Sequence, residues 1–506
     1  MWNTLKTTAL LFVIATLLAS LSATARAVPQ SLYSSNTVIS TEAFPSAGGR
    51  KREVERPCVS FHSRLLRSCS SVTTYKGKFP DGAKYLIQVP SNWNGTLVLY
   101  SHGYVIPGFS NPAEDVGDPI TGSYLLANGY ALGGSSYATT GWAVQQALPD
   151  QIKVLDKFQS LVGTPKHTVA WGHSLGGMIT AGLVQRYPSR FDAALPMCGV
   201  VAGGVGIWNQ ALDSAFAFYE LLGQGSGLQL VNIKNPVGNV TKAEKLLSKA
   251  QQTLQGRARI ALAAALGDLP GWFDPLSKEP GSTNFTAWEK NQYDWLSQVD
   301  FPFAFDFRAE LESRAGGNPS WNDGVDYQKQ LQASVDYDEV KTLYQKAGLN
   351  LADDLNTLES AKRIRARLAS VDYLKRNIIY NGEIGIPVLT LHTQGDGLAV
   401  VENETAYKDV VDEAGNGKLL RQLFVHRAGH CEFSPAEMIV AFVALTYRLD
   451  NGAWPDLNPS VLNKSADDLG PRYNVILVDN KKVRVKPEYI KFKPSVFLRP
   501  YDKRKH

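Results

Sequence analysis

Residues 167–177 read HTVAWGHSLGG, and this stretch decides the fold. An apolar run ends in GHSLG at 172–176, a G-x-S-x-G motif, and an apolar helical pattern follows it. A strand, a very tight turn and a helix in that order lift a serine hydroxyl above a parallel sheet. Gly172 and Gly176 suit the turn because side chains at these positions would clash. The stretch therefore predicts Ser174 as a nucleophile on a βα unit.

Strands and helices alternate on both sides of this motif. Candidate strands lie at 85–89, 96–101, 130–133, 192–197, 388–392 and 422–426. The run at 96–101 is apolar throughout, as is typical of a strand buried on both faces of a parallel sheet. The alternation predicts an α/β fold, with a mostly parallel sheet and helices on both faces.

The alternation is interrupted between about residues 205 and 375, where mainly helical patterns, including one over 361–376, carry many Trp and Phe residues. A sheet that is interrupted and then completed predicts one α/β domain with an inserted helical cap. We divide the chain into a signal peptide (1–27), an N-terminal arm (28–75), the α/β core (76–205 and 376–448), the cap (206–375) and a small C-terminal β appendix (449–506).

The N-terminus predicts export. Lys6 precedes an apolar run over 8–21, and Ala25-Arg26-Ala27 follows with the spacing of a cleavage site. This order is typical of a secretory signal peptide cut after Ala27; an N-terminal membrane anchor is the alternative. No later stretch approaches the roughly 18 uninterrupted apolar residues that span a bilayer. We expect a secreted protein, extracellular or periplasmic, with no membrane span in its mature form.

Charge and composition limit the partners. The net charge of +5 is small for 506 residues, and the basic residues are scattered along the chain. We therefore expect no nucleic-acid partner. The expected partner is a small-molecule or polymeric ester substrate.

The chain has four cysteines: Cys58, Cys69, Cys198 and Cys431. An even number in an exported protein indicates disulfides, and four cysteines allow three pairings. Closeness in sequence favours Cys58 with Cys69, which leaves Cys198 with Cys431. Cys and His spacings typical of a zinc site are absent from the sequence, so we expect neither a metal nor a cofactor.

A serine hydroxyl needs a base, because it is a weak nucleophile at neutral pH. His430 lies in the loop that leaves the last predicted strand, where the fold brings a base over the nucleophile. His426, at the end of that strand, is the alternative. Asp396 follows the strand at 388–392 in a turn flanked by glycines, and would orient the imidazole. Alternatively, Asp396 occupies this position only because aspartate favours turns.

An oxyanion hole needs two backbone N–H donors directed at the developing charge. Leu175, directly after the nucleophile, is expected to supply one. The second is expected from Tyr104, because His102-Gly103-Tyr104 follows the strand at 96–101 and Gly103 lets the backbone approach the substrate.

In this order, His102-Gly103, the serine motif, Asp396 and Gly429-His430 resemble the α/β-hydrolase superfamily over about residues 80–205 and 380–448. The chain looks like the exported, capped carboxylesterases and aminopeptidase-like hydrolases of that superfamily. The pair His430-Cys431 is also similar to the tannase and feruloyl esterase family, in which a disulfide joins the neighbours of the serine and the histidine. Here the residue before Ser174 is His173 rather than Cys.

Three functions agree with these residues to different degrees. The favoured one is a serine carboxylic ester hydrolase that forms an acyl-enzyme on Ser174. A serine exopeptidase would use the same triad and an acidic cap residue, such as Glu220, Glu310 or Glu312, to hold the substrate amine. A non-catalytic binding protein on a hydrolase scaffold fits less well, because every catalytic position is filled.

Overall fold

The computed structural model describes residues 71–478 and 481–501. Its centre is a nine-stranded sheet in the order β1-β2-β4-β3-β5-β6-β7-β8-β11. The strands of this sheet are β1 (Val72–Lys78), β2 (Lys84–Pro90), β3 (Thr96–Ser101), β4 (Ala131–Ser135), β5 (His167–His173), β6 (Ala193–Met197), β7 (Val388–Gly395), β8 (Leu420–Ala428) and β11 (Tyr489–Ile490). Strands β4, β3, β5, β6, β7 and β8 pair in parallel, while β1, β2 and β11 join antiparallel at the two edges.

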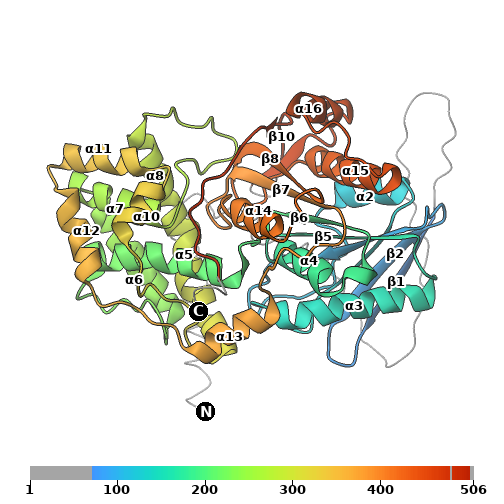
Figure 1. The fold of residues 1–506 in the computed structure, drawn as a ribbon, viewed down its shortest axis with the longest axis horizontal. Helices are drawn as coiled ribbons and strands as arrows, with labels where there is room; N and C mark the ends of the chain where they lie inside the picture. The colour runs from blue at the N-terminus through green and yellow to red at the C-terminus, as the bar shows by residue number, and fades with distance from the viewer. Residues whose placement is uncertain (1–70, 479–480, 502–506) are drawn as a thin grey trace, which may run out of the picture.

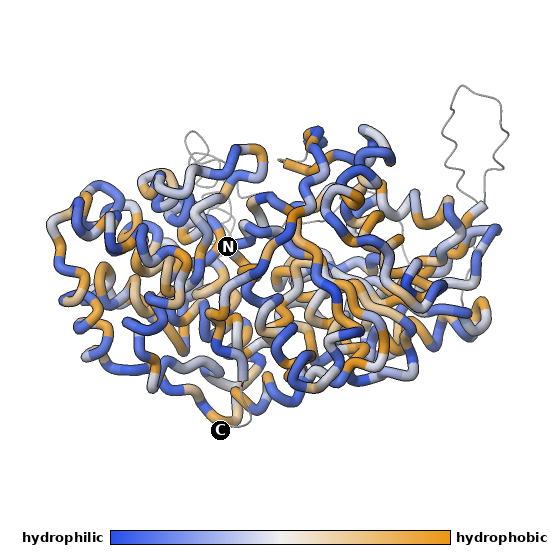
Figure 2. The backbone as a smooth tube through the Cα atoms, turned by 45° about the horizontal axis from the view of Figure 1, so that its top comes forward, coloured by the Kyte–Doolittle hydropathy of each residue, from blue (hydrophilic) through white to orange (hydrophobic). Residues whose placement is uncertain are grey.

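Helices cover both faces of the sheet (Figure 1). The core helices are α2 (Pro119–Ala127), α3 (Val144–Leu161), α4 (Leu175–Arg186), the short η2 (Pro188–Arg190), α14 (Asn403–Glu413) and α15 (Pro435–Asn451). One apolar cluster joins the sheet to α3, α4 and α14, and a second joins it to α2 and α15. The central strands are largely hydrophobic along the tube in Figure 2, as expected for strands buried on both faces. The α/β class expected from the sequence is confirmed.

The cap is inserted between β6 and β7 and lies beside the sheet (Figure 1). Its helices are α5 (Gly203–Phe218), η3 (Tyr219–Gly223), α6 (Pro236–Ala250), α7 (Leu254–Leu266), α8 (Phe285–Trp295), η4 (Leu296–Asp300), η5 (Pro302–Phe307), α9 (Arg308–Ala315), α10 (Tyr327–Ala333), α11 (Tyr337–Ala347), α12 (Leu351–Ser360) and α13 (Leu368–Asn377). The three η elements of the cap are π-helical, so α8 to α9 forms one helix with two π stretches. In Figure 2 the cap helices alternate between hydrophilic and hydrophobic residues.

Two segments begin at other residues than the sequence predicts. Strand β1 begins at Val72, inside the segment assigned to the arm, because its residues pair along the whole length of β2. The helix expected over 361–376 starts only at Leu368. The preceding residues are extended instead: the Asn322 N–H donates to the Ile364 carbonyl, the Ile364 N–H donates to the Asn322 side-chain Oδ1, and the Arg367 N–H donates to the Asn318 carbonyl.

The C-terminal region is more than a β appendix. It starts with α16 (Pro459–Asp468), continues through the hairpin of β9 (Val475–Val478) and β10 (Lys481–Arg484), and adds β11 to the main sheet. Residues 491–501 then run between the core and the cap (Figure 1). There the Arg499 guanidinium lies 2.6 Å from the buried Asp213 carboxylate of α5.

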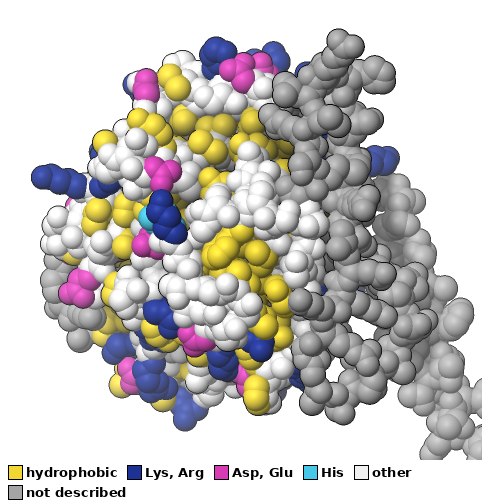
Figure 3. Space-filling view, turned by 90° about the vertical axis from the view of Figure 1, so that its right-hand side faces the viewer, with side chains coloured by type: hydrophobic (Ala, Val, Ile, Leu, Met, Phe, Trp, Pro, Cys, Tyr) yellow, Lys and Arg dark blue, Asp and Glu magenta, His cyan; other side chains and the backbone are white. Residues whose placement is uncertain are grey.

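Within the described residues, no helix has both the length and the apolarity to cross a membrane. On the face shown in Figure 3, the visible Lys and Arg side chains are dispersed among acidic and apolar side chains. The expected signal peptide lies outside the described residues, as do Cys58 and Cys69.

Candidate active site

Ser174 occupies a strained turn between β5 and α4. Its backbone has φ 58° and ψ −123°, a conformation that is rare for a residue with a side chain. A Cβ on Gly172 or Gly176 would collide with the Ser101 carbonyl oxygen of β3, so the turn tolerates only glycine there. The Ser174 N–H donates to the Met197 carbonyl at 3.0 Å, which ties the turn to the end of β6. The serine side chain is thereby held at the carboxyl ends of the parallel strands, partly exposed.

The structure brings the three predicted triad residues together. His430, in the loop between β8 and α15, places Nε2 2.8 Å from the Ser174 Oγ. Its Nδ1 lies 2.7 Å from the Asp396 Oδ2. With a proton on Nδ1 donated to this carboxylate, Nε2 is free to accept the serine proton. His426, the alternative base, lies elsewhere: its Nδ1 is 2.7 Å from the Gln394 Oε1.

Asp396 is buried and firmly held. Its Oδ1 accepts the N–H groups of Leu398 at 2.9 Å and Ala399 at 3.0 Å, while Oδ2 faces His430. Burial opposes ionisation of this carboxyl, but His430 and His392 hold its pKa below the ordinary value. Asp396 is therefore an anion that fixes the tautomer of His430 and stabilises the imidazolium formed during proton transfer.

The two expected oxyanion donors lie on either side of Ser174. Leu175 is the first residue of α4, so its N–H has no acceptor within the helix. A Cβ on Gly103 would lie 3.5 Å from the Ser174 Cβ, which places the backbone before Tyr104 beside the nucleophile. Among the described residues, neither the Leu175 nor the Tyr104 N–H has a hydrogen-bond acceptor. Both donors are available to a substrate oxygen.

His102 braces this second donor. Its Nδ1 lies 2.7 Å from the Gly103 carbonyl oxygen, and its ring stacks on Tyr137 with centroids 4.0 Å apart. The Tyr137 hydroxyl donates in turn to the His102 carbonyl at 3.1 Å. Because Gly103 and Tyr104 share one planar peptide, fixing the Gly103 carbonyl also fixes the direction of the Tyr104 N–H.

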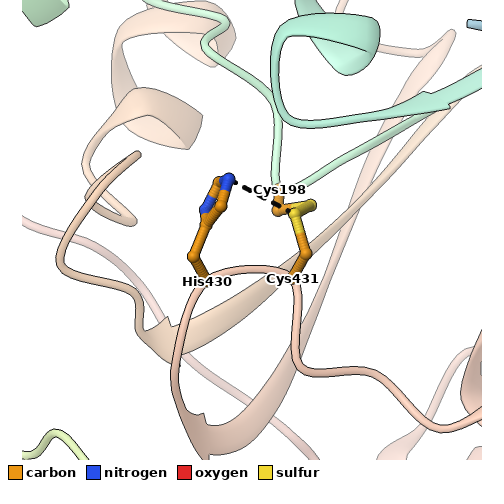
Figure 4. Close-up of side chains that lie close together, drawn as sticks. All are labelled: Cys198, His430 and Cys431. Carbon is orange, nitrogen blue, oxygen red and sulfur yellow. Dashed lines mark hydrogen bonds between the residues drawn. A yellow bond between two sulfur atoms is a disulfide. The ribbon is translucent and has the colours of Figure 1, made fainter. Parts of the chain in front are cut away.

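A disulfide joins Cys198, directly after β6, to Cys431, directly after the base (Figure 4). The Cys431 Sγ lies 3.5 Å from the His430 Nε2, so the bond packs against the imidazole itself. Cys198, His430 and Cys431 are close enough to hold a metal ion. Both thiols are consumed by the disulfide, however, and His430 faces Ser174, so these residues do not suit a metal.

The cap reaches the triad through aromatic residues. The Trp295 ring lies so close to Gly397, the residue after Asp396, that a Cβ there would collide with it. The Phe273 ring packs edge-on against Trp295 with centroids 4.9 Å apart. The Phe307 ring stacks on Tyr104 at 4.4 Å. Cap aromatics thus lie over both sides of the site.

The acidic cap residues considered for binding an amine already have partners. Glu310 pairs with Arg314 at 2.6 Å and accepts the Trp142 N–H at 2.9 Å. Glu312 is buried and accepts the Ile233 N–H at 3.1 Å, and Glu220 accepts from Gln224.

Sequence reasoning placed His392 in a strand and gave it no role. The structure puts it behind Asp396, together with Glu404 of α14. The spacing of four residues between His392 and Asp396 was the available signal, since β7 ends between them.

Comparisons with known proteins agree with this geometry. Residues 134–206, which contain the Ser174 turn, match the model of the prolyl oligopeptidase family. The chain is 29% identical over 444 residues to an o-phthalyl amidase from Xanthobacter agilis, covering 82% of this chain and 95% of the relative.

Solved structures similar to the chain include an esterase from Aspergillus oryzae, 14% identical, covering 88% of this chain and 93% of that chain, with a TM-score of 0.40. Feruloyl esterase B from the same organism is 12% identical, covering 82% and 89%, with a TM-score of 0.35. The sheet and the Ser174 turn give this chain the α/β-hydrolase fold, and the Ser174, His430 and Asp396 side chains are arranged as in the site of a serine hydrolase.

Proposed function

We propose that the protein hydrolyses carboxylic esters and amides that carry a compact aromatic acyl group, through an acyl-enzyme on Ser174. The observation that carries the proposal is the row of hydrogen bonds from Ser174 through His430 to Asp396, at 2.8 Å and 2.7 Å. The sequence alone favoured esters. The relative named an o-phthalyl amidase supports the extension to amides of an aromatic acid.

Each residue has one role in the reaction. The Ser174 Oγ attacks the acyl carbon while its proton moves to the His430 Nε2, and the oxyanion accepts the N–H groups of Leu175 and Tyr104. His430 then gives this proton to the leaving alcohol or amine, which departs as the acyl–Ser174 ester forms. A water molecule, deprotonated by His430, attacks that ester and releases the acid. The aromatic rings of Trp295, Phe273 and Phe307 support an aromatic acyl group.

The test compares matched substrates that differ in one feature. Wild type should hydrolyse p-nitrophenyl benzoate, benzoyl-p-nitroanilide and the 2-carboxybenzoyl anilide, and should react with a fluorophosphonate at Ser174. S174A should lose at least about 10⁴-fold of each activity while keeping the fold. Faster cleavage of aminoacyl-p-nitroanilides than of the benzoyl substrates would replace the proposal with an exopeptidase. Absence of fluorophosphonate labelling would instead indicate a non-catalytic binding protein.

We also propose that the protein is secreted. The disulfide between Cys198 and Cys431 supports an oxidising compartment, because such bonds are rare where glutathione keeps thiols reduced. N-terminal sequencing of protein recovered from outside the cytoplasm should begin after Ala27. Recovery with an intact residue 1 would contradict this proposal.

A further inference from the structure

His392 lies on β7, four residues before Asp396, and is completely buried. Its Nδ1 is 3.0 Å from the Glu404 Oε1, and its Nε2 is 2.7 Å from the Ala399 carbonyl oxygen. The same Nε2 is 3.5 Å from the Asp396 Oδ2, the carboxylate oxygen that faces His430. A second histidine thus stands directly behind the triad.

Both ring nitrogens of His392 face groups that only accept hydrogen bonds. The Ala399 carbonyl cannot donate, so Nε2 must carry a proton. Glu404 has two donors on its other oxygen, Oε2, which accepts the Thr390 hydroxyl and the Gln422 amide. These two bonds favour the ionised carboxylate, and a carboxylate at Oε1 requires a proton on Nδ1 as well. The geometry therefore requires a doubly protonated, positively charged ring.

We propose that His392 is a permanently charged imidazolium, paired with Glu404, whose positive charge offsets one of the two negative charges behind His430. His392 touches neither substrate nor a reacting atom, so it is a positioning residue that acts through Asp396. The inference rests on the proposed role of Ser174 and His430 in acyl transfer.

The charges around the ring support this assignment. Burial alone would lower the pKa of His392, but the hydrogen bonds and charges of Asp396 and Glu404 raise it to about 10. The titratable groups around it are Asp396 after β7, Glu402 and Glu404 at the start of α14, and His430 beyond Asp396. Burial raises the pKa of Glu402.

The charge balance has a consequence for His430. Asp396 and Glu404 each carry a negative charge and His392 a positive one, which leaves a single net negative charge behind His430. That charge matches the imidazolium that His430 becomes during catalysis. Removing the positive charge of His392 would leave two buried carboxylates, and His430 would then hold its proton more tightly.

The experiment measures the rate at which a fluorophosphonate labels Ser174 as a function of pH. This rate reports the ionisation of His430 in the free enzyme without requiring knowledge of the substrate. H392Q should move the midpoint of the acidic limb of this pH–rate profile up by about one pH unit, and E404Q should move that midpoint down. The charge-balanced double variant H392Q/E404Q should return it towards the wild-type position.

The double variant separates charge from packing. A double variant no closer to wild type than H392Q, or single variants that both keep the wild-type limb, would overturn the inference and leave His392 a packing residue. Complete absence of labelling in wild type would reject the proposed function instead, so the two failures are distinguishable.

A measurement on the unaltered protein keeps the inference testable if H392Q does not fold. With ¹⁵N-labelled histidine, one ring should show both N–H protons from about pH 5 to about pH 9. E404Q should shift the signals of that ring and so assign it. Loss of either proton within this range in wild type would contradict a permanent imidazolium.

Discussion

The core and the cap hold their buried charged groups in different ways. In the core around the triad, two sets of buried charges are paired: Arg427 forms two hydrogen bonds with Glu437, and Asp396 lies between His430 and His392. In the cap, Asp213 pairs with Arg499, but the buried carboxyl groups of Glu289, Asp300 and Asp336 have no salt-bridge partner among the described residues.

The pKa values follow this difference. Burial raises the pKa of Glu289 and of Asp300 to about 7, whereas the pKa of Asp396 lies below its ordinary value despite complete burial. Near the reacting atoms, fixed charge stabilises charge that develops. In the cap, burying an unpaired carboxyl group in its neutral form costs less free energy than burying it ionised. The two regions should therefore respond in opposite ways to pH.

The largest expected effect concerns the covalent link in the core. C198S/C431S should lower the free energy of unfolding by about 5 kcal/mol, because the bond closes a loop of 233 residues. It should also reduce kcat, since Cys431 adjoins His430 and the disulfide packs against its imidazole. Denaturant unfolding and kinetics measure the two effects. Unchanged kcat in a destabilised variant would show that the disulfide does not position His430. Reduction of wild type under native conditions is the matched control.

The core should also weaken in acid, through His173. This residue is half-buried, with its ring against Tyr100 and Met438, and desolvation of the ring lowers its pKa to about 4. The unfolded chain then binds a proton below about pH 6.5 while the folded one does not, so stability falls as the pH drops from about 6.5 to 4. Between these two pH values, the free energy of unfolding of H173Q should fall by about 3 kcal/mol less than that of wild type. Urea unfolding at both ends of the window measures it, and equal pH dependence in H173Q and wild type would contradict it.

The cap should weaken in the opposite direction. Because the pKa of Glu289 is raised in the folded protein, its contribution to the free energy of unfolding is complete below about pH 4.5. That contribution is lost as the pH rises through about 7. E289Q keeps the neutral shape and should be more stable than wild type at about pH 8 by about 3 kcal/mol, with little difference at about pH 4. Hydrogen exchange should localise the gain to α8 and its neighbours. A gain spread evenly over the core would mean that the two regions do not differ as described.

The same contrast explains what the sequence predicted. The turn at Ser174, the order of Asp396 and His430 and the buried strands were predictable, because each depends on local backbone geometry at a strand end. The pairing of His392 with Glu404 was not predictable, because the two residues meet only when α14 packs beside β7. Strand β11 has only two residues and pairs with β8 from 60 residues further along the chain, too little pattern for sequence reasoning.

The cap was harder to predict from the sequence than the core. The π stretches η4 and η5 change the helical phase between Leu296 and Phe307, so a repeat of 3.6 residues does not predict which aromatic rings face the core. Trp295, which contacts Gly397, is the last residue of α8, directly before the first π stretch. It is also the point at which the cap meets the residue after Asp396.

The smallest expected effect tests that contact. G397A adds a methyl group where the Trp295 ring now lies, and overpacking of this kind costs about 1–3 kcal/mol. Because Asp396 is held by its own hydrogen bonds, the added methyl group should displace the ring rather than the triad. We expect KM for the benzoyl ester to rise about tenfold, which corresponds to about 1.4 kcal/mol, with the acidic limb of fluorophosphonate labelling unchanged. W295L in the G397A background makes room for the methyl group and should recover part of the stability lost. A shifted acidic limb in G397A would show that the cap acts on the charges of the triad, and the division between a charged core and a neutral cap would then fail at the contact where it matters most.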